Sequence, residues 1–345
     1  MIRRTALPLG LALAASLALA ACGAKHENTG APATSDLRLV LDYLPNADHV
    51  GIYTARALGD FRKAGLNVQI QTPSDPSAPL KLVMAGKADL AISYEPEVLL
   101  ARDKGARILS VGAIATEPLT SLMSVGGRPV SPKTLAGKRV GTAGIPYQDA
   151  YLDEILQTAG IDPGRVKRVN VGFNLVPAML TGRVDATLGA FWNIEGVQLA
   201  LQHKRPRILP VDRVGVPTYD ELVLVARIDT VEHHGALIRR FLQALQRGTR
   251  TARSDPATAA DALVAAAPDI KRPYAVATVR ATLPALFPQD PKDPFGWQDP
   301  AEWNAYKDWM ERNNLLTRPA NVGQALTNEF LPGQGVGQGD ATSGG

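Results

Sequence analysis

Aromatic and hydrogen-bonding side chains follow an apolar run near the start of this sequence. The run at 37–41 ends in Asp42 and Tyr43, and Asn46 and His49 follow within a few residues. A tyrosine ring offers a flat face for stacking, and an asparagine amide both donates and accepts hydrogen bonds. These residue types indicate a binding surface, although turn formation would explain Asn46 and a hydrogen bond at a helix start would explain His49.

Later points in the sequence repeat this combination of aromatic, amide and carboxylate side chains. The further candidates for ligand contacts are Tyr94, Glu95, Tyr147, Trp192, Asn193, Glu195, Tyr219 and Glu221. A favourable charge in the first turn of a helix would also explain Glu95. A structural role beside a hinge would explain Tyr219 and Glu221. Core packing alone explains Trp192, Asn193 and Glu195 poorly, so we expect a ligand contact there.

The balance of these side chains indicates the kind of ligand that they suit. The candidate positions hold Tyr, Trp, Asn and carboxylates but few Arg or Lys, whereas a phosphate, sulfonate or nitrate pocket would use guanidinium and ammonium groups. A carboxylate can accept a hydrogen bond from an exocyclic amine and can pair with a protonated ring nitrogen. The composition therefore favours a flat heteroaromatic molecule that carries amino groups and ring nitrogens.

Catalytic sequence patterns are missing. No GxSxG, HExxH or CxxC pattern occurs, the five histidines are scattered, and the common nucleotide-binding patterns are absent. Asp42, Glu95 and Glu195 could exchange protons with a substrate, but no nucleophile accompanies them. We therefore expect a binding protein rather than an enzyme, with no cofactor and no metal. The small net charge of +4, spread along the chain, gives no sign of nucleic-acid binding.

Strands and helices alternate along the chain. The spacing of apolar residues predicts strands at 37–41, 66–70, 88–93, 106–114, 139–144, 166–172, 184–190 and 222–229. Helices are predicted at 49–64, 79–86, 96–105, 148–160, 174–182, 235–253, 256–268, 272–286 and 299–316. This alternation implies βαβ units and a largely parallel sheet.

The order of strands and helices occurs twice, which predicts two lobes of similar construction. The segment 84–89 lines up with 180–185, and each contains a glycine that can end a helix. Ligands of open parallel sheets collect beyond the carboxyl ends of the strands. The polar clusters of both lobes should therefore face one shared cleft, with Asp48 as the N-cap of the first helix.

The lobes should be joined by two crossovers of the chain. The expected divisions are lobe one at 37–123 and 221–331 and lobe two at 124–220, with crossovers at the apolar segments 122–125 and 222–226. Three tryptophans lie in or near the last predicted helix, namely Trp297, Trp303 and Trp309. We expect them to pack this helix onto lobe one.

The N-terminus has the pattern of a secretory signal. Two early arginines precede an apolar run at 6–21, which is too short for a stable membrane-spanning helix. The run ends in Leu-Ala-Ala-Cys at Cys22. This ending resembles the lipobox of bacterial lipoproteins and predicts a lipid on Cys22, although an ordinary signal peptide with a chance cysteine remains an alternative. Residues 23–36 should form a flexible tether, and 332–345 a disordered tail. With one cysteine, no disulfide can form within the chain.

Several segments together resemble a known family. They are LDYLPNADHVGIYTA, GDFRKAGLNVQI, AGKADLAISYEP, RVGTAGIPYQDAYL, FWNIEGVQL and GVPTYDELVLVA. Over residues 37–290 the chain resembles the NMT1/THI5-like family of proteins with the periplasmic-binding-protein fold. The resemblance implies an α/β fold of type II, in which two lobes, each a mostly parallel sheet flanked by helices, are joined by two crossovers. The family commonly has Trp where this chain has Tyr43, and either ring can stack on a ligand.

The resemblance also implies a function. Bacterial members are extracytoplasmic solute-binding lipoproteins of ABC importers, which implies capture of a thiamine pyrimidine precursor, of the formylaminopyrimidine or hydroxymethylpyrimidine type. The protein would be anchored to the outer face of the bacterial cell membrane through Cys22 and would deliver the ligand to the permease subunits. We expect it to act as a monomer.

Other functions within the same group remain alternatives. Riboflavin or another flat heteroaromatic molecule would suit the same stacking residues, while the sulfonate and nitrate binders would need more basic residues. A pyridoxal-phosphate-dependent pyrimidine synthase is an alternative of another class. Such synthases carry a Lys and, four residues later, a His, where this chain has Ser93 and Glu97, and they carry a cysteine-rich run where this chain reads GVPTY.

Overall fold

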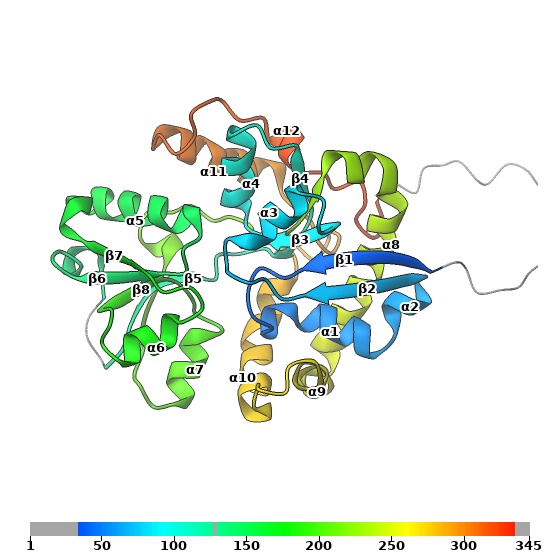
Figure 1. Ribbon diagram of the computed structural model, residues 1–345, viewed down its shortest axis with the longest axis horizontal. Coiled ribbons are helices and arrows are strands. Elements are labelled where there is room, and N and C mark those ends of the chain that lie inside the picture. Colours follow the sequence, from blue (N-terminus) through cyan, green and yellow to red (C-terminus); the bar gives the residue numbers. More distant parts are fainter. Residues whose placement is uncertain (1–33, 127–129, 335–345) are drawn as a thin grey trace, which may run out of the picture. The chain divides into compact units, whose positions relative to one another are not determined.

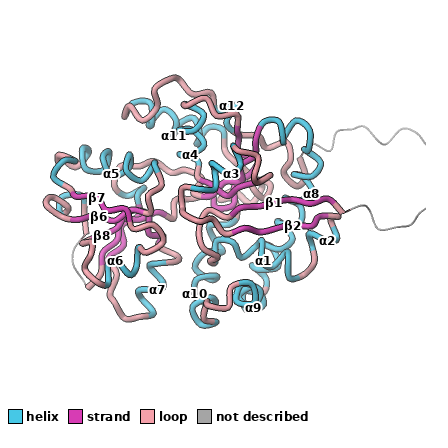
Figure 2. The backbone as a smooth tube through the Cα atoms, in the orientation of Figure 1, coloured by secondary structure: helices cyan, strands magenta, loops and turns pink. Residues whose placement is uncertain are grey.

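Two five-stranded sheets form the framework of the protein. The computed structural model describes residues 34–126 and 130–334. The predicted signal peptide, Cys22 and most of the predicted tail therefore lie outside the described residues. Helices flank both sheets (Figure 1), and Figure 2 shows the strands of each sheet side by side within its own lobe. The buried apolar side chains of both lobes belong to one continuous core.

The first sheet has the strand order β2-β1-β3-β10-β4. Its strands are β1 (Ser35–Val40), β2 (Leu66–Gln71), β3 (Leu90–Ser93), β4 (Ile108–Ala115) and β10 (Leu222–Arg227). The first three pair in parallel, and β10 runs antiparallel between β3 and β4. β3 and β4 are almost entirely apolar, apart from Ser93 and Ser110, because both of their faces are buried. β1 already begins at Ser35, so the end of the predicted tether is strand.

The second sheet repeats this arrangement with the order β7-β6-β8-β5-β9. Its strands are β5 (Thr120–Ser124), β6 (Arg139–Thr142), β7 (Lys167–Asn170), β8 (Ala186–Phe191) and β9 (Arg207–Pro210). β6 pairs in parallel with β7 and β8, while β5 runs antiparallel to β8 and β9. Each sheet thus contains one antiparallel strand at the same place, next to the edge. The predicted α/β fold with two mostly parallel sheets is confirmed.

The repeated sequence segments make the same contact in each lobe. Asp89 accepts hydrogen bonds from the backbone N and from Nε of Arg38 at 2.8 and 3.1 Å. Asp185 accepts the equivalent bonds from Arg139 at 2.9 and 3.1 Å. Both arginines lie on the equivalent strands β1 and β6, and both aspartates directly precede or begin the next parallel strand. The similarity of the two segments therefore extends from the sequence to the pairing of side chains.

The crossovers lie elsewhere than predicted. The apolar segments 122–125 and 222–226 belong to β5 and β10, which are internal strands of the two sheets. The chain passes between the sheets in the segments 116–119 and 211–221 instead. The first passage therefore precedes Thr120, and the predicted boundary at 123 is too late. An apolar run is expected inside a sheet, where both faces are covered, whereas the passages carry prolines and polar residues.

The helices agree with the predictions in order but differ at their ends. In the first part of the chain they are α1 (Val50–Ala57), α2 (Asp60–Lys63), α3 (Ala78–Met84) and α4 (Glu95–Asp103). The second lobe contains α5 (Pro146–Thr158), α6 (Leu175–Leu180) and α7 (Glu195–Leu201). The chain continues with α8 (Ile228–Ser254), α9 (Pro256–Ala266), α10 (Arg272–Thr282), α11 (Pro300–Arg312) and α12 (Val322–Ala325). Among the described residues, no helix has the length and apolar character to span a membrane.

Two predicted helices have a different form. The helix expected at 49–64 is divided into α1 and α2 because Gly59 between them has a φ of 71°, outside the helical range. α8 begins at Ile228, earlier than the predicted start at 235, and His234 within it is not helical. The sequence pattern therefore located only the part of α8 after this irregular turn.

The helix α11 contacts more than the first lobe. Trp303 donates a hydrogen bond from Nε1 to Oδ2 of Asp220 in the second crossover, at 2.7 Å. Tyr306 and Trp309 both contact Tyr151, which belongs to α5 of the second lobe. The prediction that this helix packs onto lobe one is therefore incomplete, because its aromatic face also binds the crossover and the second lobe.

Candidate functional site

A cavity with about 320 Å³ of space free of protein atoms lies where turns of both lobes meet. The predicted site residues that line it are Asp42, Tyr43, Asn46, Tyr94 and Glu195. They follow β1, β3 and β8, so the cavity lies beyond the carboxyl ends of parallel strands of both sheets, as predicted.

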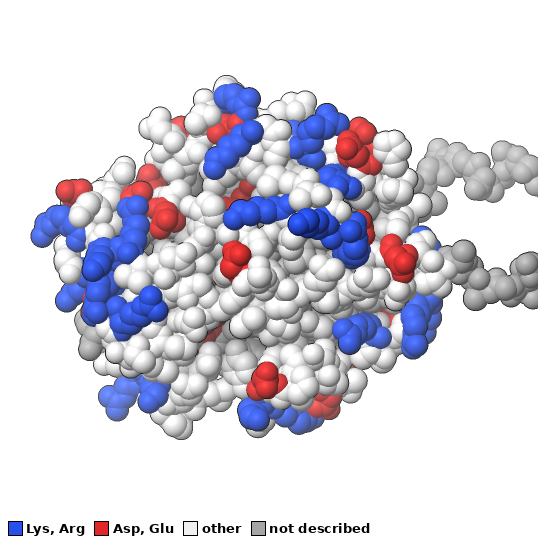
Figure 3. Space-filling view, in the orientation of Figure 1, with Lys and Arg blue, Asp and Glu red and all other residues white. Residues whose placement is uncertain are grey.

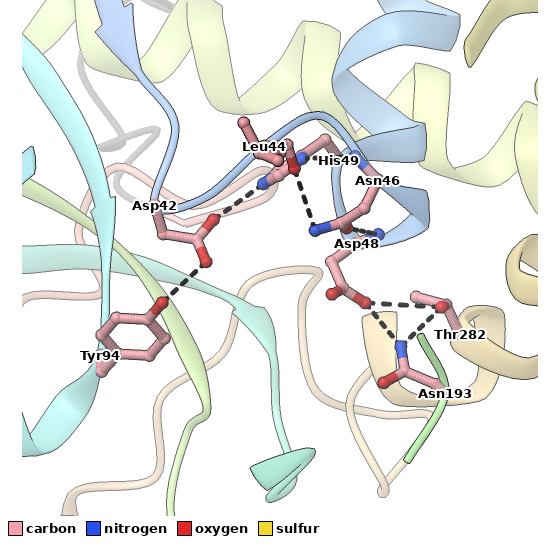
Figure 4. Close-up of polar contacts among 8 residues, drawn as sticks. All are labelled: Asp42, Leu44, Asn46, Asp48, His49, Tyr94, Asn193 and Thr282. Carbon is pink, nitrogen blue, oxygen red and sulfur yellow. Dashed lines mark hydrogen bonds and ion pairs between the residues drawn. The ribbon is translucent and has the colours of Figure 1, made fainter. Parts of the chain in front are cut away.

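Asp42 is held in the cavity wall by two hydrogen bonds (Figure 4). Its Oδ1 lies 2.8 Å from Nε2 of His49, and its Oδ2 accepts a hydrogen bond from the hydroxyl of Tyr94 at 2.8 Å. The side chain of His49 is fully buried behind Asp42. His49 therefore does not line the cavity and contributes by orienting the carboxylate.

The hydrogen bonds around His49 fix the position of its proton. The backbone N–H of Asn46 points to Nδ1 of His49 at 3.2 Å. Because an N–H group can only donate, Nδ1 accepts, and a neutral ring then carries its proton on Nε2. That N–H donates to Oδ1 of Asp42. Both oxygens of Asp42 thus receive a donor from the protein and keep further lone pairs for a ligand.

Asn46 combines turn chemistry with a place in the cavity wall. Its Oδ1 accepts a hydrogen bond from the backbone N–H of Asp48 at 2.7 Å, and it begins the short 3₁₀ turn Ala47–His49 that precedes α1. The prediction of Asp48 as N-cap is therefore wrong, because Asn46 is the cap. Asp48 points in another direction, toward the second lobe.

Tyr43 connects the lobes at the side of the cavity. Its hydroxyl donates a hydrogen bond to the carbonyl oxygen of Gly172 at 3.3 Å. Its ring meets Phe173 edge to face, with centroids 4.7 Å apart. Burial and the nearby carboxylates raise the pKa of Tyr43, so its hydroxyl stays protonated and acts as a donor. Tyr43 therefore offers a ring to the cavity and also ties the first lobe to the second.

Glu195 is the second carboxylate of the cavity wall. Its Oε2 accepts a hydrogen bond from the backbone N–H of Phe191 at 2.8 Å. Burial raises the pKa of Glu195 to about 7, and the charge of Asp42 contributes in the same direction. Glu195 can therefore change its protonation state near neutral pH, when a ligand brings a positive charge or an amine to it.

The structure adds cavity residues that were not predicted. They are Ala143, Ile145, Gln148, Gly189, Phe191 and Ile194. Oε1 of Gln148 accepts a hydrogen bond from the backbone N–H of Ala143 at 2.8 Å, which fixes this amide at the wall. A Cβ on Gly189 would lie 2.3 Å from Nε2 of Gln148, and the φ of Gly189 is 111°. Gln148 and Phe191 are direct neighbours of the predicted Tyr147 and Trp192, so the sequence identified the turns but not the residues that face inward.

Three predicted site residues lie behind the cavity, at the crossovers. Oε2 of Glu221 accepts hydrogen bonds from the backbone N–H groups of Leu119 and Thr120 at 2.7 and 2.8 Å. The hydroxyl of Tyr219 donates to the same oxygen at 2.9 Å, and that of Tyr147 donates to Oε1 at 3.4 Å. None of the three side chains lines the cavity. Tyr219 and Glu221 lie in the segment 211–221 that joins the lobes, and Tyr147 reaches Glu221 from α5.

Two further predicted residues are also turned toward the crossovers. Trp192 donates a hydrogen bond from Nε1 to the carbonyl oxygen of Pro118 at 3.1 Å. Glu95 is fully buried, and its Oε2 accepts a hydrogen bond from the backbone N–H of Asp220 at 2.8 Å. Neither side chain lines the cavity, because each binds the chain that joins the lobes, although Oε1 of Glu95 is buried without a partner among the described residues.

Asn193 joins the lobes beside the cavity. Its Nδ2 donates to Oδ1 of Asp48 at 2.6 Å and to Oγ1 of Thr282 at 2.7 Å (Figure 4). The side chain is fully buried and does not line the cavity. The structure thus places it between the lobes rather than at the ligand's expected position.

The charged side chains of the cavity wall are acidic. Its described residues include Asp42 and Glu195 but no Lys or Arg. Figure 3 shows that basic side chains gather on the outer surface of the second lobe, at the left. Among the described residues, no group of three or more His, Cys, Asp or Glu is placed to hold a metal ion. The site can accept hydrogen bonds and stack rings.

The two sheets and the cavity between the lobes have the arrangement of the periplasmic-binding-protein fold. The alkanesulfonate-binding protein SsuA from Xanthomonas axonopodis pv. citri, bound to MOPS, has a similar structure, with a TM-score of 0.67 and 16% identity. The match covers 86% of this chain and 98% of that one. SsuA from Escherichia coli matches with a TM-score of 0.64 and 16% identity, over 85% of this chain and 97% of that one. At this identity the likeness shows the fold alone.

The chain belongs to the NMT1/THI5-like family, whose model matches residues 46–259. The formylaminopyrimidine-binding protein of Halalkalibacterium halodurans is 33% identical, over 92% of this chain and 96% of that protein. A putative thiamine biosynthesis protein of Haemophilus influenzae is 36% identical, over 74% of this chain and 81% of that protein. The 4-amino-5-hydroxymethyl-2-methylpyrimidine phosphate synthase of Legionella pneumophila is 26% identical, over 86% of this chain and 93% of that enzyme. The resemblance seen in the sequence is therefore confirmed.

Proposed function

We propose that this protein binds a thiamine pyrimidine precursor, of the formylaminopyrimidine or hydroxymethylpyrimidine type, in the cavity between its lobes. The observation that carries the proposal is the oriented carboxylate of Asp42, which lies in a wall without Lys or Arg. An aminopyrimidine presents an exocyclic amine and ring nitrogens in one plane. Asp42 and Glu195 can accept from that edge, and the rings of Tyr43 and Tyr94 can contact its face.

The limited space between the cavity walls favours a small ligand. The space of about 320 Å³ free of protein atoms includes space open to solvent, so it is an upper bound on the room for a ligand. A single substituted ring suits this space better than the three fused rings and the side chain of riboflavin. A sulfonate or nitrate would lack a cationic partner in the described wall, and two carboxylates would repel it.

Binding rather than catalysis is also supported at the positions that distinguish the synthases. The chain has Ser93 and Glu97 where the resemblance implies Lys and His. Oε1 of Glu97 accepts a hydrogen bond from the backbone N–H of Tyr147 at 3.2 Å, so this side chain contacts the second lobe instead of a cofactor. Without a lysine at Ser93 no Schiff base with pyridoxal phosphate can form there.

The N-terminal sequence supports a function outside the cytoplasm. The basic start, the apolar run and the Leu-Ala-Ala-Cys ending favour export and a lipid on Cys22, which would hold the protein at the outer face of the cell membrane. A tethered binding protein of this fold would deliver its ligand to the permease of an ABC importer. Mass spectrometry of the protein from membranes tests the anchor, since a lipid-modified N-terminal cysteine is expected.

Isothermal titration of the purified protein tests the ligand directly. Formylaminopyrimidine, hydroxymethylpyrimidine, riboflavin and taurine are titrated in parallel, and saturable binding of a pyrimidine with weak or no binding of the others is expected. Tight binding of taurine or riboflavin alone would refute the proposal. Mixing with pyridoxal phosphate is the control for the synthase alternative, and a new Schiff-base absorption band would favour the enzyme.

A further inference from the structure

Three buried polar side chains connect the lobes beside the cavity without lining it. Asp48 lies in the turn before α1, Thr282 ends α10, and Asn193 lies in the turn between β8 and α7 of the second lobe. Nδ2 of Asn193 donates to both partners, at 2.6 Å to Asp48 and 2.7 Å to Thr282, and the hydroxyl of Thr282 lies 3.4 Å from Oδ1 of Asp48. All three side chains are at most 2% exposed. Figure 4 shows Asp48 and Asn193 directed at each other across the gap between the lobes.

Two atoms of this cluster lack a hydrogen bond. Oδ2 of Asp48 and Oδ1 of Asn193 are buried and have no partner among the described residues. An ionised Asp48 would therefore place a negative charge on an oxygen that receives no donor, which is costly in a buried site. A protonated Asp48 removes this charge and keeps the bond that Asn193 donates to Oδ1.

The groups that face Asp48 favour its neutral form. Burial raises the pKa of Asp48 well above its ordinary value, the carboxylates of Asp42, Glu195 and Glu221 raise it further, and only the hydrogen bond from Asn193 lowers it. Tyr274 of α10 also interacts with Asp48, and burial raises its own pKa, so it brings no charge of its own. Among the described residues, no ion pair involves Asp48.

We propose that Asp48, Asn193 and Thr282 form a latch that holds the lobes closed and that Asp48 takes up a proton from solvent when the latch forms. The three are positioning residues, since they act on the ligand only by keeping the two walls of the cavity together. The proposal rests on the proposed function only in that a ligand in the cavity benefits from closure. The proton taken up by Asp48 makes closure, and with it ligand binding, sensitive to pH.

The direction of this sensitivity follows from proton linkage. When the lobes separate, Asn193 leaves and water reaches Asp48, whose pKa returns to about 3.9. The closed form has the higher pKa, so it binds the additional proton. Above about pH 4, each further pH unit weakens closure by up to about tenfold, until the pKa of the closed form is passed. The latch therefore favours the closed form at low pH.

The first test replaces Asp48 with asparagine. The variant Asp48→Asn has nearly the same shape, carries no charge, and has an amide that can donate to the unpaired Oδ1 of Asn193. Closure is measured without ligand by the distance between spin labels at Lys87→Cys and Arg183→Cys, two exposed positions in different lobes, in the full chain with Cys22→Ser. The closed fraction of the parent should fall from about pH 5 to about pH 8, and that of Asp48→Asn should fall clearly less, because its latch has no carboxyl group at position 48 to titrate. Equal pH profiles of parent and variant would overturn the proposal.

A second set of variants tests the latch through ligand affinity. Asn193→Ala and Thr282→Val should each weaken pyrimidine binding by about fivefold or more, because a buried hydrogen bond is lost only in the closed form. Thr278→Val is the matched control, since among the described residues the hydroxyl of Thr278 bonds within α10, to the carbonyl oxygens of Tyr274 and Ala275. Equal losses in Thr278→Val and Thr282→Val, or no loss in Asn193→Ala, would overturn the latch.

The two measurements separate this inference from the proposed function. Because Glu195 also titrates in the cavity, parent and Asp48→Asn are compared at each pH. If no pyrimidine binds but the closed fraction depends on pH more strongly in the parent than in Asp48→Asn, the latch stands and the proposed ligand fails. If a pyrimidine binds with the same affinity in all latch variants, the ligand stands and the latch fails.

Discussion

Replacing Asp42 with asparagine removes the negative charge from the cavity wall while it keeps the size of the side chain. In the native protein, His49 and Tyr94 donate to the two oxygens at 2.8 Å each. In the variant, the amide oxygen can still accept from His49, and the hydroxyl of Tyr94 can rotate to accept from the new amide N–H. The wall should therefore keep its shape, and the loss should fall on the ligand.

The expected loss can be derived from the hydrogen bond to the ligand. A hydrogen bond to a charged group contributes about 1.5–3 kcal/mol, and Asp42 is only 1% exposed, so solvent weakens it little. Binding of an aminopyrimidine to Asp42→Asn should thus be about 10–150-fold weaker than binding to the native protein. The thermal midpoint should change little.

Isothermal titration at neutral pH measures this loss, with Asp60→Asn as the matched control. Asp60 is also a buried carboxylate of the first lobe, but it pairs with Lys63 and Arg247 and does not line the cavity. The control should bind the pyrimidine within about twofold of the native protein. If Asp42→Asn binds as tightly as the control, the ligand does not use this carboxylate, and the central argument for the site is refuted.

Three further predictions concern the cavity and the buried carboxylates. In the Asp48→Asn variant, whose latch does not titrate, affinity for an aminopyrimidine should rise from about pH 6 to about pH 8 as Glu195, whose pKa is about 7, becomes ionised, and the additional change Glu195→Gln should remove this rise. Gly189→Ala should lower the thermal midpoint by several degrees or more, since the new methyl group meets Gln148 at 2.3 Å and the φ is 111°; an unchanged midpoint would contradict this. Burial raises the pKa of Glu95 in the folded protein, so the stability that it contributes is present at low pH and is lost as pH rises above about 4. Urea denaturation should find Glu95→Gln more stable than the native protein at pH 8 and similar to it near pH 4, and equal stability at both would refute the assignment.

The sequence predicted the architecture better than the exact division of the chain. Alternating strands and helices, repeated twice, identified two α/β lobes, and the aligned Asp89 and Asp185 make equivalent contacts. The segments 122–125 and 222–226 are predicted as crossovers but are internal strands. An apolar run can be either a central strand or a buried connection, and local periodicity does not distinguish these two structures. The partner strands that decide the matter are distant in the sequence.

The candidate site was located by its turns but not residue by residue. Phe191 ends β8 and Glu195 begins α7, and both line the cavity, whereas Trp192 and Asn193 in the turn between them bind the crossover and the first lobe. The side chains of a turn follow neither the strand nor the helix period, so the sequence pattern cannot choose between them. The direction of each side chain depends on contacts with the other lobe, which only the folded structure supplies.

The position of β10 has a consequence for the order in which the protein can be assembled. β10 lies between β3 and β4, and β4 has no other strand neighbour in the described sheet. All strands of the second sheet lie between Thr120 and Pro210, so that half can assemble as soon as its own stretch has been synthesised. The sheet of the first lobe cannot be completed, and β4 has no strand to pair with, until Leu222–Arg227 has been synthesised. The half that begins the chain is therefore the later one to mature, and a truncated product that stops before Leu222 would leave an unprotected strand edge prone to aggregation.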